Sequence, residues 1–217
     1  MESVMNRKIK FWNRIAKKYA KSPVADQASY EKKLQITQSY LQPEMEIFEI
    51  GCGTGTTALL HAPFVQRIHA LDFSETMIEI CREKAKSLSI ENVFFECKDI
   101  EGLSKEKNHY DAVMAHSVLH LVDDKQSIID NAYDLLKPGG IFVSSTICLT
   151  GFYAVLKYVW PVMYWLGIFP SLRFFSSQAL IDAHISSGFT IDYQWQTSSN
   201  NLFLIAKKNK PPQNIHQ

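Results

Sequence analysis

Three glycines alternate with short side chains after an apolar run that has the character of a buried strand. Gly51, Gly53 and Gly55 follow residues 46–50 and precede a stretch with helical character. Glycine lets the backbone approach a ligand closely, and the N–H groups at the start of a following helix attract an anionic group. The pattern indicates a ligand-binding loop. The alternative is a tight strand-to-helix turn without a ligand.

Two acidic residues follow the next two apolar runs. Asp72 comes 21 residues after Gly51, where a carboxylate can accept hydrogen bonds from both hydroxyls of a ribose, and Asp99 follows residues 93–97. If both runs are parallel strands, the two acids share one sheet edge with the glycine loop, and we expect a nucleoside pocket there. A solvated loop acid or a helix cap is the alternative for Asp99. A nicotinamide fingerprint would require glycine at position 56, where the chain has Thr56.

Two histidines lie just beyond a fourth apolar run, at His116 and His120. His116 has two interpretations: a general base or acceptor ligand, or a hydrogen-bonding residue that lines the ligand pocket. The spacing of four residues lets both histidines contact one metal ion, but the sequence offers no third ligand. We therefore predict no metal site.

The elements that position these residues alternate between strand and helix. Strands are predicted at residues 46–50, 67–71, 93–97, 110–115 and 141–146. Helices are predicted between them, including one capped by Ser74 with Met77, Ile78, Cys81, Ala85 and Leu88 on its buried side. Short alternating connections of this kind give a parallel sheet covered on both faces. Residues 189–196 and 202–207, separated by five polar residues, predict an antiparallel hairpin after a helix at 177–187.

The N-terminal segment is strongly basic. Residues 1–21 carry seven Lys and Arg against one Glu, a net charge of +6, so the rest of the chain carries −5 of the total of +1. Apolar residues at helical spacing predict an amphipathic helix there, and a second helix is expected at about 25–40.

Composition bounds the remaining possibilities. With 217 residues, 46% hydrophobic and 21% charged, the chain fits one soluble domain. A net charge of +1 gives no overall field to hold a polyanion, so we expect no nucleic-acid partner. The four cysteines match neither paired metal spacing nor a disulfide framework, and no secretory signal is apparent. A cytoplasmic location is expected.

These motifs together resemble the class I S-adenosylmethionine-dependent methyltransferases, the seven-stranded Rossmann-like group. The resemblance covers residues 45–146, and it is carried by residues 49–55, 71–74, 99–100, 110–113 and 136–140. It implies an α/β fold with a doubly wound seven-stranded sheet, mostly parallel with an antiparallel C-terminal hairpin. N-terminal helices and a helical cap insertion complete this expected fold.

The resemblance also implies a binding role for each motif, with S-adenosyl-L-methionine as the cofactor. Asp72 would hold the ribose. Phe73 and Met77 would flank the adenine, and Asp99 with the backbone of Ile100 would read its amine edge. The methionine portion would contact the glycine loop and two N-terminal tyrosines, for which core packing is the alternative: Glu49, Gly51, Cys52, Gly53, Tyr19 and Tyr30.

The implied activity is methyl transfer by in-line displacement to a small, apolar acceptor. His116 would be the catalytic base or a further cofactor-contacting residue, at the edge where similar enzymes keep acceptor-facing groups. The loop after this strand lacks the Asn/Asp-Pro-Pro-Tyr signature of enzymes that methylate amino groups of nucleic acids. The competing interpretation is a non-catalytic module that binds the cofactor or associates with a membrane.

Residues 151–170 contain a dense run of apolar and aromatic side chains around one charge, Lys157. Pro161 and the position within the fold favour a helical cap over an acceptor site, and the alternatives are contact with a membrane, dimerisation or core packing. The predicted organisation is one domain, 1–210, with N-terminal helices (1–42), cofactor core (43–150), apolar cap (151–175) and last helix with hairpin (176–210). Residues 211–217 are expected to form a disordered tail, and the oligomeric state is left open.

Overall fold

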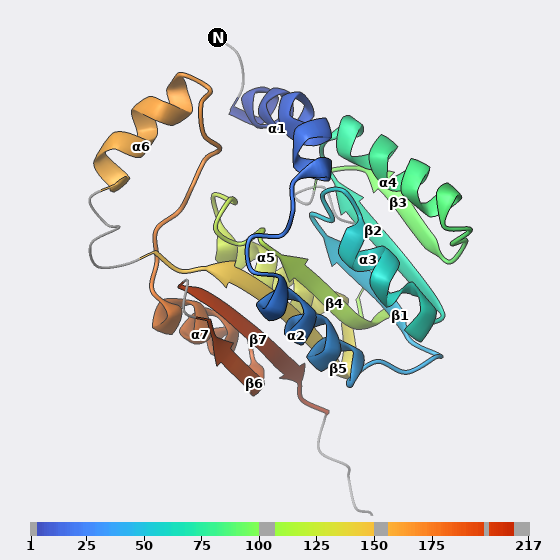
Figure 1. Ribbon diagram of the computed structural model, residues 1–217. Helices are drawn as coiled ribbons and strands as arrows, with labels where there is room; N and C mark the ends of the chain where they lie inside the picture. The colour runs from blue at the N-terminus through green and yellow to red at the C-terminus, as the bar shows by residue number, and fades with distance from the viewer. Residues whose placement is uncertain (1–3, 100–106, 150–155, 198–199, 211–217) are drawn as a thin grey trace, which may run out of the picture.

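The computed structural model describes residues 4–99, 107–149, 156–197 and 200–210. Its centre is a seven-stranded sheet in the order β3-β2-β1-β4-β5-β7-β6 (Figure 1). Strands β1 to β5 are parallel, and β7 pairs antiparallel with β5 and β6. This confirms the predicted sheet and hairpin. The strands are β1 (Glu46–Ile50), β2 (Arg67–Asp72), β3 (Val93–Cys97), β4 (Tyr110–His116), β5 (Leu136–Ile147), β6 (Phe189–Gln196) and β7 (Asn201–Lys208).

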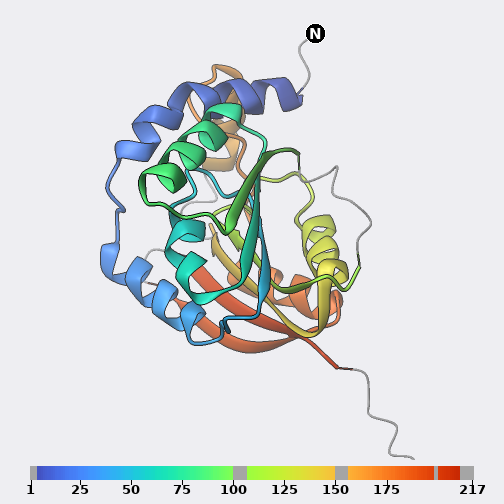
Figure 2. The ribbon, with the colours of Figure 1, turned by 90° about the vertical axis from the view of Figure 1, so that its right-hand side faces the viewer.

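Helices cover both faces of the sheet (Figures 1 and 2). One face carries α2 (Gln27–Gln38), α3 (Thr56–His61), the 3-10 turn η1 (Ala62–Phe64) and α4 (Glu75–Ser87), and the other carries α5 (Lys125–Leu135) and α7 (Ser177–Ser186). The buried residues form two clusters. One lies beneath α3 and α4 and includes Ile47 and Met114, and the other lies beneath α5 and α7 and includes Phe142. Burial on both faces explains the apolar strands of the sequence.

Helix α4 shows how local sequence sets these boundaries. The Ser74 hydroxyl accepts a hydrogen bond from the Met77 N–H over 3.2 Å, and this satisfies an otherwise unpaired donor in the first turn. Four of the five residues predicted on the buried side are buried: Met77, Ile78, Cys81 and Ala85. Leu88 was wrongly assigned to it: this residue is 60% exposed, because the helix ends at Ser87 and Leu88 is its C-cap.

The strand order places the candidate site at one sheet edge. Strands β1 and β4 are neighbours at the point where the order of strands reverses, and ligands of open α/β sheets bind beside the carboxyl ends there. The glycine loop follows β1, Asp72 ends β2 and His116 ends β4. The topology therefore brings the predicted residues together.

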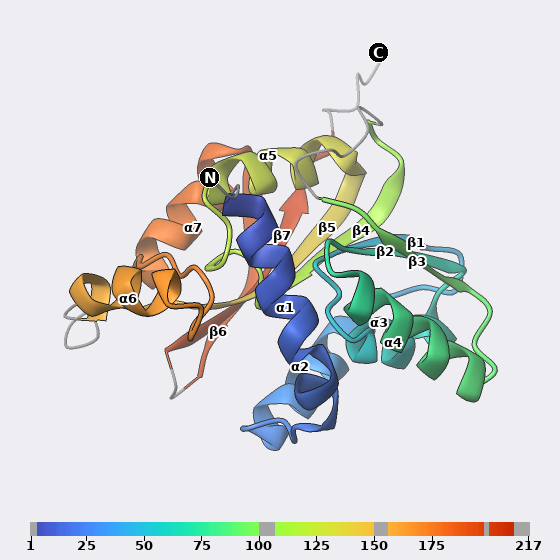
Figure 3. The same cartoon turned by 90° about the horizontal axis from the view of Figure 1, so that it is seen from above.

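Two further helices lie near this edge. The predicted amphipathic helix is α1 (Val4–Lys21), which crosses above the carboxyl ends of the strands and packs against α4 (Figure 3). Helix α6 (Leu156–Trp165) contains Pro161, and the segment after it reaches α1, where the Arg14 guanidinium donates to the Gly167 carbonyl. Within the described residues, no helix combines the length and the apolar character needed to cross a bilayer.

Candidate cofactor-binding site

The glycine loop needs its glycines for two different reasons. Gly51 and Gly53 both adopt positive φ, +64° and +55°, which side chains other than glycine rarely take. A Cβ on Gly51 would lie 2.5 Å from Cγ2 of Val118, whereas a Cβ on Gly53 would have no heavy atom within 4 Å. Gly51 therefore permits close packing, and Gly53 faces open space that a ligand can enter.

Asp72 is tied to this loop. Its Oδ2 accepts from the Gly53 N–H over 3.0 Å, and its Oδ1 accepts from the Ser74 N–H over 2.8 Å. Burial raises the pKa of Asp72 to about 6, while the two backbone hydrogen bonds oppose this rise. The carboxylate is thus fixed at the end of β2 and borders a cavity.

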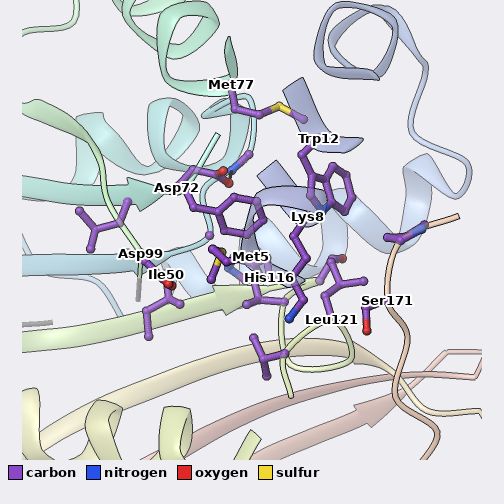
Figure 4. Close-up of a pocket in the computed structure, with 18 of the residues that line it drawn as sticks. Met5, Lys8, Trp12, Ile50, Asp72, Met77, Asp99, His116, Leu121 and Ser171 are labelled. Atoms are coloured by element: carbon purple, nitrogen blue, oxygen red, sulfur yellow. Dashed lines mark hydrogen bonds between the residues drawn. The ribbon is translucent and has the colours of Figure 1, made fainter. Parts of the chain in front are cut away.

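The first cavity has a volume of about 120 Å³, and it brings together Asp72, Phe73, Met77 and Asp99, the residues predicted to hold adenosine. Trp12 and Lys8 of α1 project into it, between Asp72 on one side and Leu121 and Ser171 on the other (Figure 4). Small-molecule sites usually measure about 300 to 1,000 Å³. The space beside the α1 side chains is therefore smaller than that of a usual ligand site.

Glu49 lies on the other side of the glycine loop. Its side chain is buried, and Oε2 has no hydrogen-bond partner among the described residues. Burial, and then the nearby Asp72, raise the pKa of Glu49 to about 8. A buried carboxyl group without a partner is costly, and a cationic or hydrogen-donating ligand would supply the missing interaction.

The second cavity, of about 630 Å³, adjoins the first at the glycine loop. Glu49, Cys52 and Tyr30 line it, which are residues predicted for the methionine end of the cofactor. Both cavities share a further set of predicted residues: Tyr19, Gly51, Gly53 and His116. The Tyr30 hydroxyl also lies 3.2 Å from Oγ1 of Thr57, at the start of α3.

His116 is the last residue of β4, and its Nε2 is buried with no hydrogen-bond partner within the described ranges. Burial, followed by His61 and Lys33, lowers the pKa of His116 to about 3, so its imidazole is neutral at physiological pH. His120 is also buried, but it lines neither cavity. Among the residues that the structure describes, no group of three potential ligands could hold a metal ion.

The structure thus gathers eleven of the predicted binding residues around two adjoining cavities. Ile100 lies outside the described residues. Sequence reasoning missed Lys8 and Trp12 in the first cavity, and Lys33 and His61 in the second. The apolar spacing of the N-terminal helix could have indicated Trp12, whereas no sequence signal distinguishes Lys33 from its charged neighbours.

The apolar cap is placed differently from the expectation. Of residues 158–170, whose side chains the structure describes, only Pro170 lines either of the two cavities, and Ser171 also lines the first. Instead, Tyr164, Trp165 and Phe169 border a separate groove against α1. The described part of the cap therefore lies mainly outside the two cavities, and residues 151–155 lie outside the described residues.

The strand order, the glycine loop and the acid that ends β2 define the class I S-adenosylmethionine-dependent methyltransferase fold. A family model described as a methyltransferase domain matches residues 41–201, and the chain belongs to this family. S-adenosylmethionine is the cofactor that this family uses. The Glu49 oxygen, which has no partner among the described residues, and the open space at Gly53 fit the ammonium group of its amino-acid end.

Curated relatives match about half to two thirds of the chain. The ubiquinone biosynthesis O-methyltransferase of Coxiella burnetii is 32% identical over 112 residues, 52% of this chain and 47% of that protein. The malonyl-[acyl-carrier protein] O-methyltransferase of Priestia megaterium is 34% identical over 140 residues, 63% of this chain and 50% of that protein. The chain thus matches about half the length of these relatives.

Solved structures share the fold at low identity. A methyltransferase of Mesorhizobium loti superposes with a TM-score of 0.68 at 20% identity, covering 84% of this chain and 99% of that one. The [4+2]-cyclase SpnF superposes with a TM-score of 0.70 at 18% identity, covering 83% and 81%. Because the second is named a cyclase, likeness at this level shows the fold and not the reaction.

Proposed function

We propose that this protein transfers a methyl group from S-adenosylmethionine to a small-molecule acceptor. The observation that carries the proposal is the pairing of two cavities at the glycine loop. Asp72 and Asp99 border the first, and the unpartnered Glu49 carboxyl borders the second. The adenosine group of the cofactor matches the first cavity, and its amino-acid group matches the second.

The chain's own residues would position the reactants. Bound S-adenosylmethionine supplies a methyl group already activated on a sulfonium, so the protein needs chiefly to orient the acceptor and exclude water. Neutral His116 lines both cavities and can accept a hydrogen bond from an acceptor hydroxyl or amine. In this proposal His116 orients the acceptor through that hydrogen bond, and the proton that the acceptor loses passes to water.

The second cavity supports a polar rather than an apolar environment for the reacting end of the acceptor. Its lining includes Lys33, His61 and Ser145 in addition to Glu49. The expected apolar acceptor rested on residues 151–170, whose described part lies mainly outside both cavities. Val24, Leu34 and Ile147 also line this cavity, so an apolar portion of the acceptor has a surface to contact there.

Calorimetry and a product assay together test the proposed function. S-adenosylmethionine and S-adenosylhomocysteine should bind at one site, and methyl-labelled S-adenosylmethionine should label a molecule in polar or lipid metabolite extracts. Binding without any labelled product would favour the non-catalytic module. If neither compound binds, the proposed enzyme function is rejected. Preferential binding of nicotinamide dinucleotides would indicate a nicotinamide-dependent enzyme instead.

We also propose that the groove between α1 and the segment after α6 contacts an anionic membrane surface. Arg7, Lys10 and Arg14 border the groove beside apolar side chains, and Trp165 is 69% exposed. Basic and aromatic side chains on one face suit the boundary of an anionic bilayer. Further exposed apolar residues here are Tyr158, Val159, Val162, Leu166, Ile168 and Phe169.

Liposome cosedimentation tests this contact. Binding to vesicles with anionic lipid should weaken as salt rises, and it should be lost in Lys17→Glu/Lys18→Glu. The double variant Lys86→Glu/Lys107→Glu changes the net charge equally outside α1 and should bind like the wild type. Equal loss in both variants, or no binding at low salt, would reject the membrane contact.

We keep the cytoplasmic location and the absence of a nucleic-acid partner as parts of the proposal. The four cysteines are unpaired, which suits a reducing compartment. The balanced total charge of +1 supports a small-molecule rather than a polyanionic partner.

A further inference from the structure

The far end of the second cavity carries basic and polar groups that the cofactor assignment does not use. On the sheet face beneath α2, Ser145 of β5 and Asn201 of β7 line the cavity. Lys33 of α2 and His61 at the end of α3 line it from above. Four elements therefore converge on one polar region.

Lys33 is the charged centre of this region. Its Nζ donates to Oγ of Ser145 over 3.2 Å, and the Ser145 hydroxyl donates to Oδ1 of Asn201 over 3.0 Å. Lys33, Ser145 and Asn201 thus form a chain of two hydrogen bonds in which the ammonium group is the first donor and the amide oxygen is the last acceptor. The remaining N–H groups of Lys33 are available to another acceptor.

The half-buried Lys33 forms no ion pair with any carboxylate of the described chain, and burial lowers its pKa. The acid that acts on it is Asp26, an exposed residue at the cavity rim whose side chain caps α2 through the Ser29 N–H. A partly desolvated ammonium group without a paired carboxylate favours an anionic ligand.

His61 and His116 add neutral hydrogen-bonding groups near this ammonium. His61 is 0% exposed, and neither of its ring nitrogens has a hydrogen-bond partner in the part of the chain that the structure describes. Burial lowers the pKa of His61 to about 4, so the ring is neutral and carries one N–H donor. Lys33, His61 and His116 line the same cavity, and the first two lower the pKa of His116.

The position of Ser145 separates this region from the loop that would hold the methionine portion. Ser145 pairs in register with His116 of β4, and β4 lies between β5 and β1. Neighbouring strands are about 4.8 Å apart, so β5 lies roughly 10 Å from the strand that carries the glycine loop. Lys33 therefore lies on the side of the cavity away from the first cavity.

We propose that Lys33 binds a carboxylate or similar anionic group of the methyl acceptor. The acceptor class is then a small organic acid whose reacting atom lies toward His116, between this anchor and the glycine loop. The inference rests on the proposed function, because it assigns the part of the second cavity that the cofactor leaves over.

The test measures binding of organic acids to the protein saturated with S-adenosylhomocysteine. Benzoate and octanoate serve as probes, each compared with its uncharged amide, and ligand-observed NMR gives the affinity. Both acids, or the better fitting one, should bind more tightly than the amide. Lys33→Met should weaken that binding at least tenfold. The matched control Lys86→Met removes an exposed lysine of α4, outside both cavities, and should change nothing.

A second arm separates the acceptor from the carboxylate of the cofactor. Lys33→Met should leave the affinities for S-adenosylhomocysteine and for 5′-methylthioadenosine, which lacks the amino-acid group, at wild-type values. Weakened binding of S-adenosylhomocysteine alone would assign Lys33 to the cofactor and overturn the inference. Equal binding of acids and amides, or of acids by wild type and Lys33→Met, would also overturn it. Failure of the proposed function would appear instead as wild-type protein that does not bind S-adenosylhomocysteine.

Discussion

The two cavities beside the glycine loop differ in size, in lining and in the helix that covers them. The first, under α1, has about 120 Å³ and receives Trp12 and Lys8. The second, under α2, has about 630 Å³ and contains the polar groups of Glu49 and Lys33. We infer that α1 controls entry of the nucleoside, whereas Lys33 of α2 and Glu49 of β1 recognise charge in the second cavity. A ligand that occupies only one of the two cavities can test each cavity separately.

The largest expected effect belongs to the first cavity. Asp72→Ala removes the carboxylate predicted to hold the ribose, and it should weaken binding of both S-adenosylhomocysteine and 5′-methylthioadenosine by about 1 to 3 kcal/mol. Calorimetry measures both affinities. Asp182→Ala, which removes an acid of α7, is the control. Affinities that stay at wild-type values would remove Asp72 from the site.

The second cavity should distinguish the same two ligands. Glu49→Gln removes the carboxylate predicted to meet the amino-acid end, so it should weaken S-adenosylhomocysteine roughly tenfold, as expected for a charged hydrogen bond. Binding of 5′-methylthioadenosine should not change. If both ligands lose affinity equally in calorimetry, Glu49 does not distinguish the two ends of the cofactor.

The pH dependence follows from the same carboxyl group. The pKa of Glu49 is about 8 in the protein without ligand, and an ammonium ligand favours its ionised form. Binding therefore releases a proton below that pH, and affinity for S-adenosylhomocysteine should rise by up to about tenfold per pH unit from about pH 6 to about pH 8. Calorimetry in buffers of different ionisation enthalpy measures the released proton. A flat profile, or the same slope in Glu49→Gln, would contradict this role.

The two glycines should respond differently to alanine. Gly51→Ala should destabilise the fold more, because its positive φ costs about 1 to 2 kcal/mol and its Cβ meets Val118. Gly53→Ala bears the φ cost alone, yet its Cβ enters the ligand space and should weaken S-adenosylhomocysteine binding. Urea denaturation and calorimetry on both variants provide the comparison. Equal destabilisation would mean that the Val118 contact relaxes without cost.

The smallest expected effect concerns access to the first cavity. Trp12→Ala removes a side chain that projects into it and should speed association of S-adenosylhomocysteine by a few-fold in stopped-flow measurements. Trp165→Ala removes an exposed tryptophan outside both cavities and should leave the rate alone. An unchanged rate in Trp12→Ala would show that α1 does not limit entry.

Much of the fold could be predicted because its determinants are local. The strand and helix periods, the Ser74 cap and the glycine loop each depend on a few neighbouring residues. Because parallel strands end at the same edge of the sheet, Asp72 and His116 are then expected close together. The placement of Lys33 and Trp12 could not be predicted, since it depends on how α1 and α2 pack over the sheet. Leu88 fits the apolar spacing of α4 but lies beyond its last turn.

The apolar segment 151–170 shows a further limit of composition. Its residues predict burial or contact, but they do not specify the partner. In the described part, the Trp160 indole donates to the Pro170 carbonyl over 2.8 Å and stacks on Phe169, so the segment packs largely on itself. Several neighbouring side chains remain exposed, and this leads to the membrane proposal instead of an acceptor lid.

A crystal structure of the protein grown with S-adenosylhomocysteine tests the central claim most directly. The account predicts electron density that spans both cavities, with the ribose hydroxyls on Asp72 and the amino-acid end beside Glu49. Trp12 should be displaced from its present position. Saturated protein whose two cavities hold no ligand density, or whose ligand lies elsewhere, would contradict the account.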